Sequence, residues 1–183
     1  MPDPVPNPDL LRSLGRLVRG LSVLFWGVPV ALVVCVQTAQ ADYLRMFGVL
    51  PPLVVTAVLV YGLELLRHFR REERIWRLAL ERAQIFAVVN LGLSPFLFWW
   101  SKLPSSSFFT AMTQLMAVSG LLFLFMLNPV LRRLTAMLPD ETLRHETLVF
   151  TRMNTILLGL ILLLMTVSLV LFYAGWEPVA GGQ

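Results

Sequence analysis

The sequence predicts an all-α, polytopic helical membrane protein with about five transmembrane helices, its N-terminus inside and its C-terminus outside. Hydrophobic residues make up 57% of the 183 residues and charged residues 14%, against about 45–50% and about 25% in soluble globular domains. Apolar stretches of about twenty residues, the length that crosses a bilayer as a helix, recur along the chain. A length of 183 residues is expected to form a single domain, residues 1–183.

The distribution of arginine and lysine predicts the orientation. Three of the fifteen lie in the N-terminal lead, six in a connection over 67–82 and four in a second connection over 128–152, which leaves Arg45 and Lys102 elsewhere. Positive charge gathers on the cytoplasmic side of membrane proteins, so the lead and both connections are predicted to lie inside. Interfacial aromatic residues favour the same orientation, because they fall at the opposite ends of the apolar segments. They are Tyr43, Trp99, Trp100, Tyr173 and Trp176.

The elements follow in order from the N-terminus. Residues 1–10 hold four prolines and two aspartates, which predict a disordered lead. A short amphipathic piece leads into the first apolar segment, where Gly27 and Pro29 predict a kink. The predicted spans are 21–38, 46–66, 83–100, 108–127 and 153–173.

The N-terminal segment also has the order of a signal peptide. Basic residues precede an apolar core, and Ala39-Gln40-Ala41 resembles a cleavage sequence. The core is long and the lead contains aspartates, so we predict a retained span. The sequence leaves cleavage open, and cleavage would not change the orientation of the later segments.

Prolines and glycines predict where the helices begin and end. Pro51 and Pro52 are expected near the outer start of the second span, where a helix tolerates proline. Asn128-Pro129 is expected to close the fourth span, and Lys102 with Pro104 to form a tight outer turn. Residues 63–90 contain neither residue type, although the chain must reverse between the second and third spans. Either the second span continues inward as a helix, or a corner forms without a breaker.

The connection over 67–82 is the candidate interaction surface. In a helix its first four arginines share one face, and Trp76 lies with apolar residues on the other. This pattern is typical of a helix in a membrane interface, so we expect contact with anionic headgroups or with a partner. A solvated loop helix is the alternative. The predicted contact residues are Arg67, Arg70, Arg71, Arg74 and Trp76.

Acidic residues near this connection are expected to form ion pairs. Glu73, Arg77 and Glu81 stand four apart, the spacing at which helical side chains meet. Glu64, the one ionisable residue inside an apolar segment, lies within a turn of the predicted inner end. We expect it either to extend its carboxylate to the membrane interface or to pair with Arg67 or His68.

Uncharged polar and small residues occupy the middle of the spans. Such polar groups typically form hydrogen bonds between helices, and Asn90 and Gln114 are also the candidates for a polar path. Small residues spaced three and four apart allow helix backbones to approach closely. The helix-packing residues predicted on this basis are Thr113, Ala117, Gly120, Thr155 and Gly159.

The sequence contains little that predicts chemistry. Cys35 is the single cysteine, which excludes an internal disulfide and a Cys-x-x-Cys pair. His68 and His145 each follow an arginine in a charged connection, where an exposed histidine is ordinary. We predict no catalytic residue, no metal and no cofactor. Nucleic acid is not an expected partner, because the basic residues lie at the ends of apolar segments.

These observations favour a non-enzymatic integral membrane protein that serves as an accessory or scaffold subunit through its basic cytoplasmic connections. The expected partners are membrane lipids with anionic headgroups, and either other membrane protein subunits or further copies of the chain. A small oligomeric transporter or channel is the alternative, with broken helices at Pro29, Gly92–Pro95 and Pro129. Fourteen arginines against one lysine favour a bacterial source, hence the bacterial cytoplasmic (inner) membrane.

Overall fold

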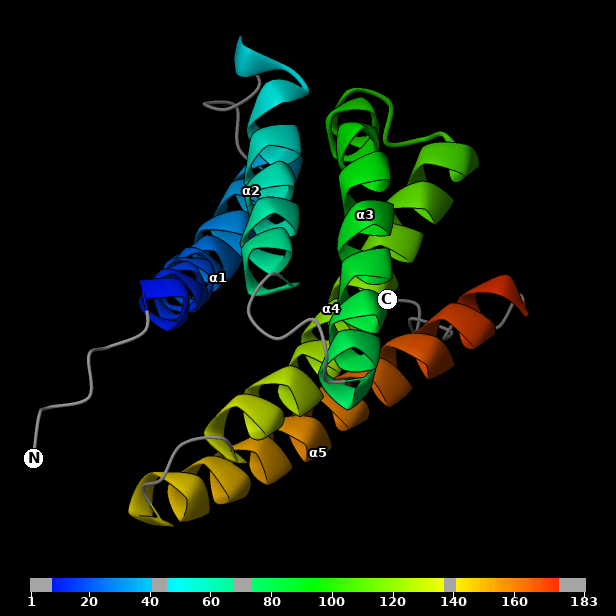
Figure 1. Cartoon of the computed structure of the whole chain (residues 1–183). Coiled ribbons are helices and arrows are strands. Elements are labelled where there is room, and N and C mark those ends of the chain that lie inside the picture. The colour runs from blue at the N-terminus through cyan, green and yellow to red at the C-terminus, as the bar shows by residue number, and fades with distance from the viewer. Residues whose placement is uncertain (1–7, 41–45, 68–73, 137–140, 175–183) are drawn as a thin grey trace, which may run out of the picture. The chain divides into compact units, whose positions relative to one another are not determined.

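The computed structural model describes residues 8–40, 46–67, 74–136 and 141–174. Five long helices, and no strand, lie in these ranges (Figure 1). They are α1 Pro8–Gln40, α2 Leu50–Arg67, α3 Arg74–Lys102, α4 Ser107–Ala136 and α5 Glu141–Tyr173. Each contains a stretch long and apolar enough to cross a membrane. The prediction of an all-α chain with five membrane-spanning helices is therefore confirmed, and the orientation stays a prediction.

The chain divides into two compact units, residues 1–130 and 131–183. The first contains α1, α2, α3 and α4 as far as Val130, and the second contains the end of α4 and all of α5. The single domain expected over 1–183 stays a prediction.

Four helices extend well beyond the predicted spans, and the long extensions are on the side predicted to be cytoplasmic. α1 begins at Pro8, α3 at Arg74 and α5 at Glu141, and α4 continues to Ala136. Leucine, arginine and glutamate, which are good helix formers, are frequent in these extensions. Residues 8–10, expected in a disordered lead, form the first turn of α1, while residues 1–7 lie outside the described ranges. Many of the basic residues are therefore carried on helices rather than on loops.

The Arg-rich connection is not one separate helix. Within the described residues, α2 extends to Arg67 and α3 begins at Arg74. Residues 74–82 instead form the first turns of α3, continuous with the third span. Residues 68–73, where the chain passes from one helix to the other, lie outside the described ranges.

Prolines lie in the first turns of α1 and α2, and inside α1, α3 and α4. Pro51 and Pro52 occupy the first turn of α2, near the predicted position. The expectation that Asn128-Pro129 ends the fourth helix was wrong, because α4 continues through Pro129 to Ala136. Pro29 and Pro95 lie inside α1 and α3. Transmembrane helices tolerate such prolines when other groups satisfy the freed backbone carbonyl.

At Pro95 the structure shows how that carbonyl is satisfied. A proline has no N–H to donate to the carbonyl four residues before it, which for Pro95 is the carbonyl of Leu91. The Ser94 hydroxyl donates a hydrogen bond to this oxygen at 2.9 Å. The serine directly before the proline therefore replaces the missing backbone donor.

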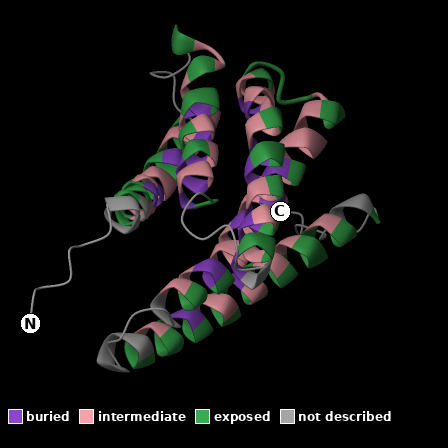
Figure 2. Cartoon of the chain, in the orientation of Figure 1, coloured by how far each residue is buried: buried purple, intermediate pink, exposed green. Residues whose placement is uncertain are grey.

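Glycines allow α1 and α2 to approach closely. A Cβ placed on Gly20 would lie 3.0 Å from the Gly62 carbonyl oxygen, and a Cβ placed on Gly62 would lie 3.0 Å from Val23 Cγ1. One on Gly27 would lie 3.0 Å from Leu59 Cδ2. Around these contacts, each helix buries a stripe of residues spaced mainly three, four or seven apart (Figure 2). The stripes are Gly20, Leu24, Ala31 and Thr38 on α1, and Pro52, Thr56, Leu59, Gly62, Leu63 and Leu66 on α2.

One face of α3 is buried along nearly its whole length. Its buried residues follow one another at alternating intervals of four and three, the spacing that keeps side chains on one face of a helix. They are Trp76, Leu80, Ala83, Ala87, Asn90, Ser94 and Leu97. This face joins the start of α3, in the predicted cytoplasmic connection, to its membrane-spanning part.

A tight turn with aromatic packing joins α3 to α4. The Leu103 N–H donates to the Trp99 carbonyl at 2.9 Å, closing α3, and Trp100 Nε1 donates to Thr110 Oγ1 on α4 at 3.3 Å. The rings of Trp99 and Phe109 stack with centroids 6.4 Å apart. The tight turn predicted around Lys102 and Pro104 is therefore present, and its location outside stays a prediction.

The second unit consists largely of α5. Apolar side chains are exposed along most of this helix, while Thr151 and Leu158 are buried among those that the structure describes. The threonine hydroxyls donate back along the helix, from Thr155 to the Thr151 carbonyl at 2.6 Å and from Thr166 to the Leu162 carbonyl at 2.7 Å. A helix with apolar side chains outward and its hydroxyls satisfied internally is suited to contact with lipid tails.

The orientation can be tested with a reporter enzyme that works only outside the cytoplasm. Fused after Gln183 it should be active, and inserted at Arg74 it should be inactive, because the basic residues favour the cytoplasmic side. Activity measured in intact cells checks both positions. The opposite pair of signals would overturn the assignment of sides.

Candidate functional site

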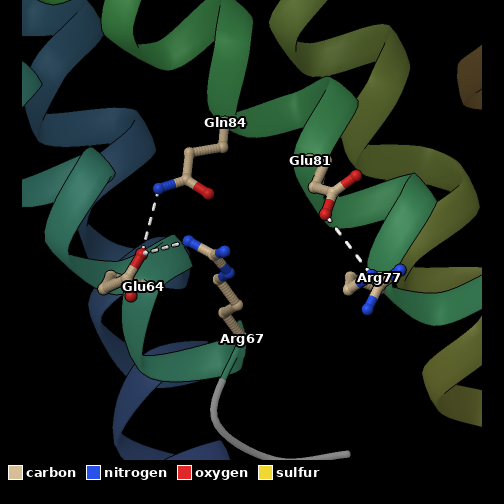
Figure 3. Close-up of polar contacts among 5 residues, drawn as sticks. All are labelled: Glu64, Arg67, Arg77, Glu81 and Gln84. Carbon is tan, nitrogen blue, oxygen red and sulfur yellow. Dashed lines mark hydrogen bonds and ion pairs between the residues drawn. The ribbon is translucent and has the colours of Figure 1, made fainter. Parts of the chain in front are cut away.

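Polar contacts connect α2 to α3 at the end of α2 (Figure 3). Gln84 Nε2 on α3 donates a hydrogen bond to Glu64 Oε2 on α2 at 3.0 Å. The same carboxylate oxygen lies 3.7 Å from Arg67 Nη1, one turn further along α2. The expected pairing of Glu64 with Arg67 is therefore present, and Gln84 adds a link between helices that the sequence pattern did not predict.

A second ion pair lies within α3. Arg77 Nε is 3.5 Å from Glu81 Oε1, four residues apart as expected (Figure 3). Both side chains are about half exposed, and pairs of this kind contribute only about 0.3–0.5 kcal/mol. Glu73, the third member of the predicted row, lies outside the described residues.

The structure describes the side chains of two of the predicted contact residues, Arg67 and Trp76. Arg67 pairs with Glu64, as its spacing predicts. Trp76 was expected to contact lipid or a partner, yet its side chain is 1% exposed because it begins the buried face of α3. Arg70 and Arg71 lie outside the described ranges, and Arg74 is the first residue of α3 with its side chain outside the description.

Exposed arginines lie on the helical extensions. In the first unit, three occupy the early turns of α1 and two those of α3. In the second unit, two lie at the end of α4 and one in α5. They are Arg12, Arg16, Arg19, Arg77, Arg82, Arg132, Arg133 and Arg152.

The middle of the α3–α4 pair contains buried polar groups. Asn90 Oδ1 is buried without a hydrogen-bond partner, and it lies 4.0 Å from the position of a Cβ on Gly120 of α4. The hydroxyls of Thr113 and Ser119 on α4 are also buried without a partner. An unpaired buried polar group is unfavourable by about 1–3 kcal/mol, so these positions would gain stability from an added hydrogen-bonding partner.

The two residues of the predicted polar path are placed differently. Asn90 is buried beside Gly120, whereas Gln114 is half-buried on α4. Gln114 precedes Gly120 by six residues, which is about 9 Å along a helix axis. Asn90 and Gly120 are therefore neighbours across α3 and α4, and Gln114 lies further along α4.

The predicted packing residues differ in their observed surroundings. Gly120 lies against Asn90, but Ala117 is exposed and does not share this contact. No atom of its own unit lies within 4 Å of the position that a Cβ on Gly159 would occupy, and Thr155 donates its hydroxyl within α5. The packing role of these two residues stays a prediction. The close backbone contact instead uses Gly20 and Gly62, which were not among the predicted packing residues.

Groups that could hold a metal are not found among the described residues. No cluster of three or more histidine, cysteine, aspartate or glutamate side chains lies in these ranges. His145 is exposed on α5, and His68 lies outside the description.

Comparison with known protein families, with curated proteins and with solved structures finds no match. The class of the protein therefore comes from its helices. Five helices long and apolar enough to cross a bilayer are compatible with an integral membrane protein.

Proposed function

We propose that the chain is a non-enzymatic accessory or scaffold subunit of a membrane assembly, acting through the basic ends of its helices. The supporting observation is that the arginines are carried on regular helical extensions of the spans, where several are exposed. Side chains on a helix are spaced by its backbone, so less ordering is lost on binding than with a flexible loop. Such ends suit contact with acidic surfaces of a partner and with anionic lipid headgroups.

The beginning of α3 adds an electrostatic reason. Its first turn contains Arg74 and Arg77 and no acidic residue. The N-terminus of a helix already carries a partial positive charge, so acidic groups are favourable there and basic ones are not. The turn is therefore short of negative charge, which an acidic partner or a lipid phosphate would supply. Each arginine near an anionic membrane surface contributes about 1 kcal/mol.

Changing Arg70, Arg71 and Arg74 together to glutamine should remove a bound partner or anionic lipid. Native mass spectrometry of the purified wild type and triple variant reports which adduct disappears. Loss of a protein adduct supports the accessory role, and loss of anionic lipid alone supports membrane anchoring. If both adducts survive, these arginines set only the orientation of the chain and the proposal fails.

Arg77→Gln is the matched control for this experiment. Arg77 lies on the same connection, but it is already paired with Glu81. Its replacement should leave most of the adduct in place, because mainly an internal ion pair is lost. An equal effect from the single variant would mean that the adduct depends on total charge rather than on the three arginines.

A small oligomeric transporter or channel is the second candidate. The unpaired polar atoms of Asn90, Thr113 and Ser119 favour it, because polar groups at membrane depth often mark a substrate path. If it is correct, a screen of small polar solutes should find one that raises the unfolding temperature of the wild type but not of Asn90→Leu. Gln114→Leu tests the other predicted path residue in the same assay. No stabilisation by any solute, or equal stabilisation in Asn90→Leu, would exclude Asn90 from such a path.

A further inference from the structure

One exposed stripe of α1 changes from basic to apolar along the helix. Its members follow one another at alternating intervals of three and four residues, which keeps their side chains on one face. All are exposed, and in order they are Arg12, Gly15, Arg19, Ser22, Trp26, Pro29 and Val33. Arg16, which is also exposed, lies beside Arg12 and Arg19 at spacings of four and three. The stripe is therefore basic at the start of α1 and apolar from Trp26 onward.

The contact between α1 and α2 leaves this stripe uncovered. α1 packs against α2 through Gly20, Leu24 and Gly27, and none of these three residues belongs to the exposed stripe. Trp26 and Val33, in its apolar part, are 67% and 60% exposed. A ligand can therefore lie along the stripe without disturbing the contact of α1 with α2.

The arginines at the start of the stripe carry uncompensated charge. Residues 10–41 contain three arginines and neither aspartate nor glutamate, and no ion pair is found for these arginines among the described residues. Glu64, the one acidic residue of α2, already binds Arg67 and Gln84. The basic part of the stripe therefore favours an anionic ligand from outside the unit.

Distances along α1 indicate which anionic ligand fits. The exposed residues between Ser22 and Gln37 are all apolar, and from Arg19 to Gln37 the helix rises about 27 Å, close to the hydrocarbon thickness of about 30 Å. When the apolar part lies among lipid tails, Arg16, Arg19 and Ser22 therefore lie at the level of the headgroups. A phospholipid presents the same order of groups, with an anionic phosphate, then polar ester groups, then acyl chains. An acidic soluble protein would match the arginines alone.

We propose that the exposed stripe of α1 binds an anionic phospholipid, with the phosphate on Arg16 and Arg19, the ester groups beside Ser22 and the acyl chains along Trp26 and Val33. Guanidinium groups hold phosphate oxygens through paired N–H donors, which adds directional hydrogen bonds to the attraction of charge. The inference rests on the proposed role of the basic helix ends and deepens it, because it assigns one of these ends to lipid rather than to a protein.

Photo-cross-linking in vesicles of equal parts anionic phosphatidylglycerol and zwitterionic phosphatidylcholine tests the site. In a Cys35→Ser background, Gly15→Cys carries a benzophenone among the arginines, where no atom lies within 4 Å of a Cβ. Gln37→Cys carries one at the other polar end of α1, as the matched control. Mass spectrometry should find a ratio of anionic to zwitterionic adducts at least about fivefold higher at Gly15→Cys, the preference that one arginine near a membrane surface provides. Equal ratios at both positions, or cross-linking to a second copy of the chain in place of lipid, would overturn the proposal.

Variants of the two central arginines test which groups hold the lipid. Arg16→Gln combined with Arg19→Gln should lower the adduct ratio at Gly15→Cys to the ratio at Gln37→Cys, because the charge at headgroup level is removed. Lysine at both positions keeps the charge and should keep most of the enrichment. An unchanged ratio in the glutamine variant would show that these arginines do not bind the lipid.

A second pair of arginines separates this site from the total charge of the chain. Arg132→Gln combined with Arg133→Gln removes the same charge from exposed positions of α4 and should leave the ratio at Gly15→Cys unchanged. An equal fall in this variant would contradict a site on α1. The vesicles contain no other protein, so a negative result counts against the lipid site alone. The accessory role fails separately, if the variant with glutamine at positions 70, 71 and 74 keeps its protein adduct.

Discussion

Trp76→Ala should lower the free energy of unfolding by about 3–5 kcal/mol, the usual range for removing a buried tryptophan. The side chain is 1% exposed and begins the buried face of α3, so alanine would leave a cavity. Unfolding by denaturant in detergent micelles, followed by circular dichroism, measures the loss. A tryptophan dipped into the lipid interface would instead be replaced at little cost.

Two further variants test whether the loss of stability comes from the buried ring of Trp76. Trp76→Phe should be much milder, because it keeps most of the ring and removes an indole N–H that has no partner in its buried position. Leu78→Ala, two residues further along α3, changes a side chain that is 44% exposed and should be nearly silent. Equal losses for Trp76→Ala and Leu78→Ala would show that Trp76 is not part of the packed interior.

The misassignment of Trp76 has a physical reason. The sequence does contain the pattern of a buried face that includes Trp76. Residues 76, 80, 83, 87, 90, 94 and 97 follow one side of a helix without interruption, and all are buried. The density of charge over 67–82 suggested a separate surface helix, so this spacing was not continued across Ala83. Hydropathy predicts where a chain leaves the hydrocarbon, but the helix continues until a residue or a tertiary contact ends it. The spans were therefore predicted well and the helix ends poorly.

Helix packing was harder to predict for a different reason. Spacing within one segment identifies small residues that share a face, but it does not identify the face that meets a partner helix. Ala117 fits the pattern and is nevertheless exposed. Gly20 and Gly62 are far apart in sequence, and their meeting depends on how α1 and α2 are aligned. The sequence pattern that could have indicated this contact is the pair Gly20 and Gly27, which lie seven residues apart and therefore on one face of α1.

The polar contacts also fall into two kinds. Those within one helix could be predicted from spacing, and those between helices could not. The pairing of Arg77 with Glu81 depends on one helix alone, and its spacing predicted it. The hydrogen bond from Gln84 to Glu64 joins two helices, so it required the tertiary structure. The Asn90 contact with Gly120 is likewise between helices. Candidate polar residues could be named from sequence, but not the groups they face.

Gly20→Leu should separate α1 from α2 and lower the free energy of unfolding by about 1–3 kcal/mol or more, the range for overpacking a close contact. A Cβ at this position would already lie 3.0 Å from the Gly62 carbonyl oxygen and 3.1 Å from Leu65 Cβ. A backbone oxygen cannot move aside as a flexible side chain can, so the two helices must shift. Gly62→Leu should act in the same way from the other side, because its Cβ would meet Val23.

Gly15→Leu is the matched control for this pair of variants. Gly15 lies on the same helix, and no atom lies within 4 Å of the position its Cβ would occupy. Leucine is also a better helix former than glycine, which is less favourable than alanine by about 0.8–1.0 kcal/mol, so this variant should be as stable as the wild type or more stable. The same gain in helix propensity is present in Gly20→Leu, where the steric conflict must outweigh it. Thermal unfolding of all three variants in one detergent separates the two effects: if Gly20→Leu and Gly62→Leu unfold at the temperature of Gly15→Leu, α1 and α2 do not meet through these glycines.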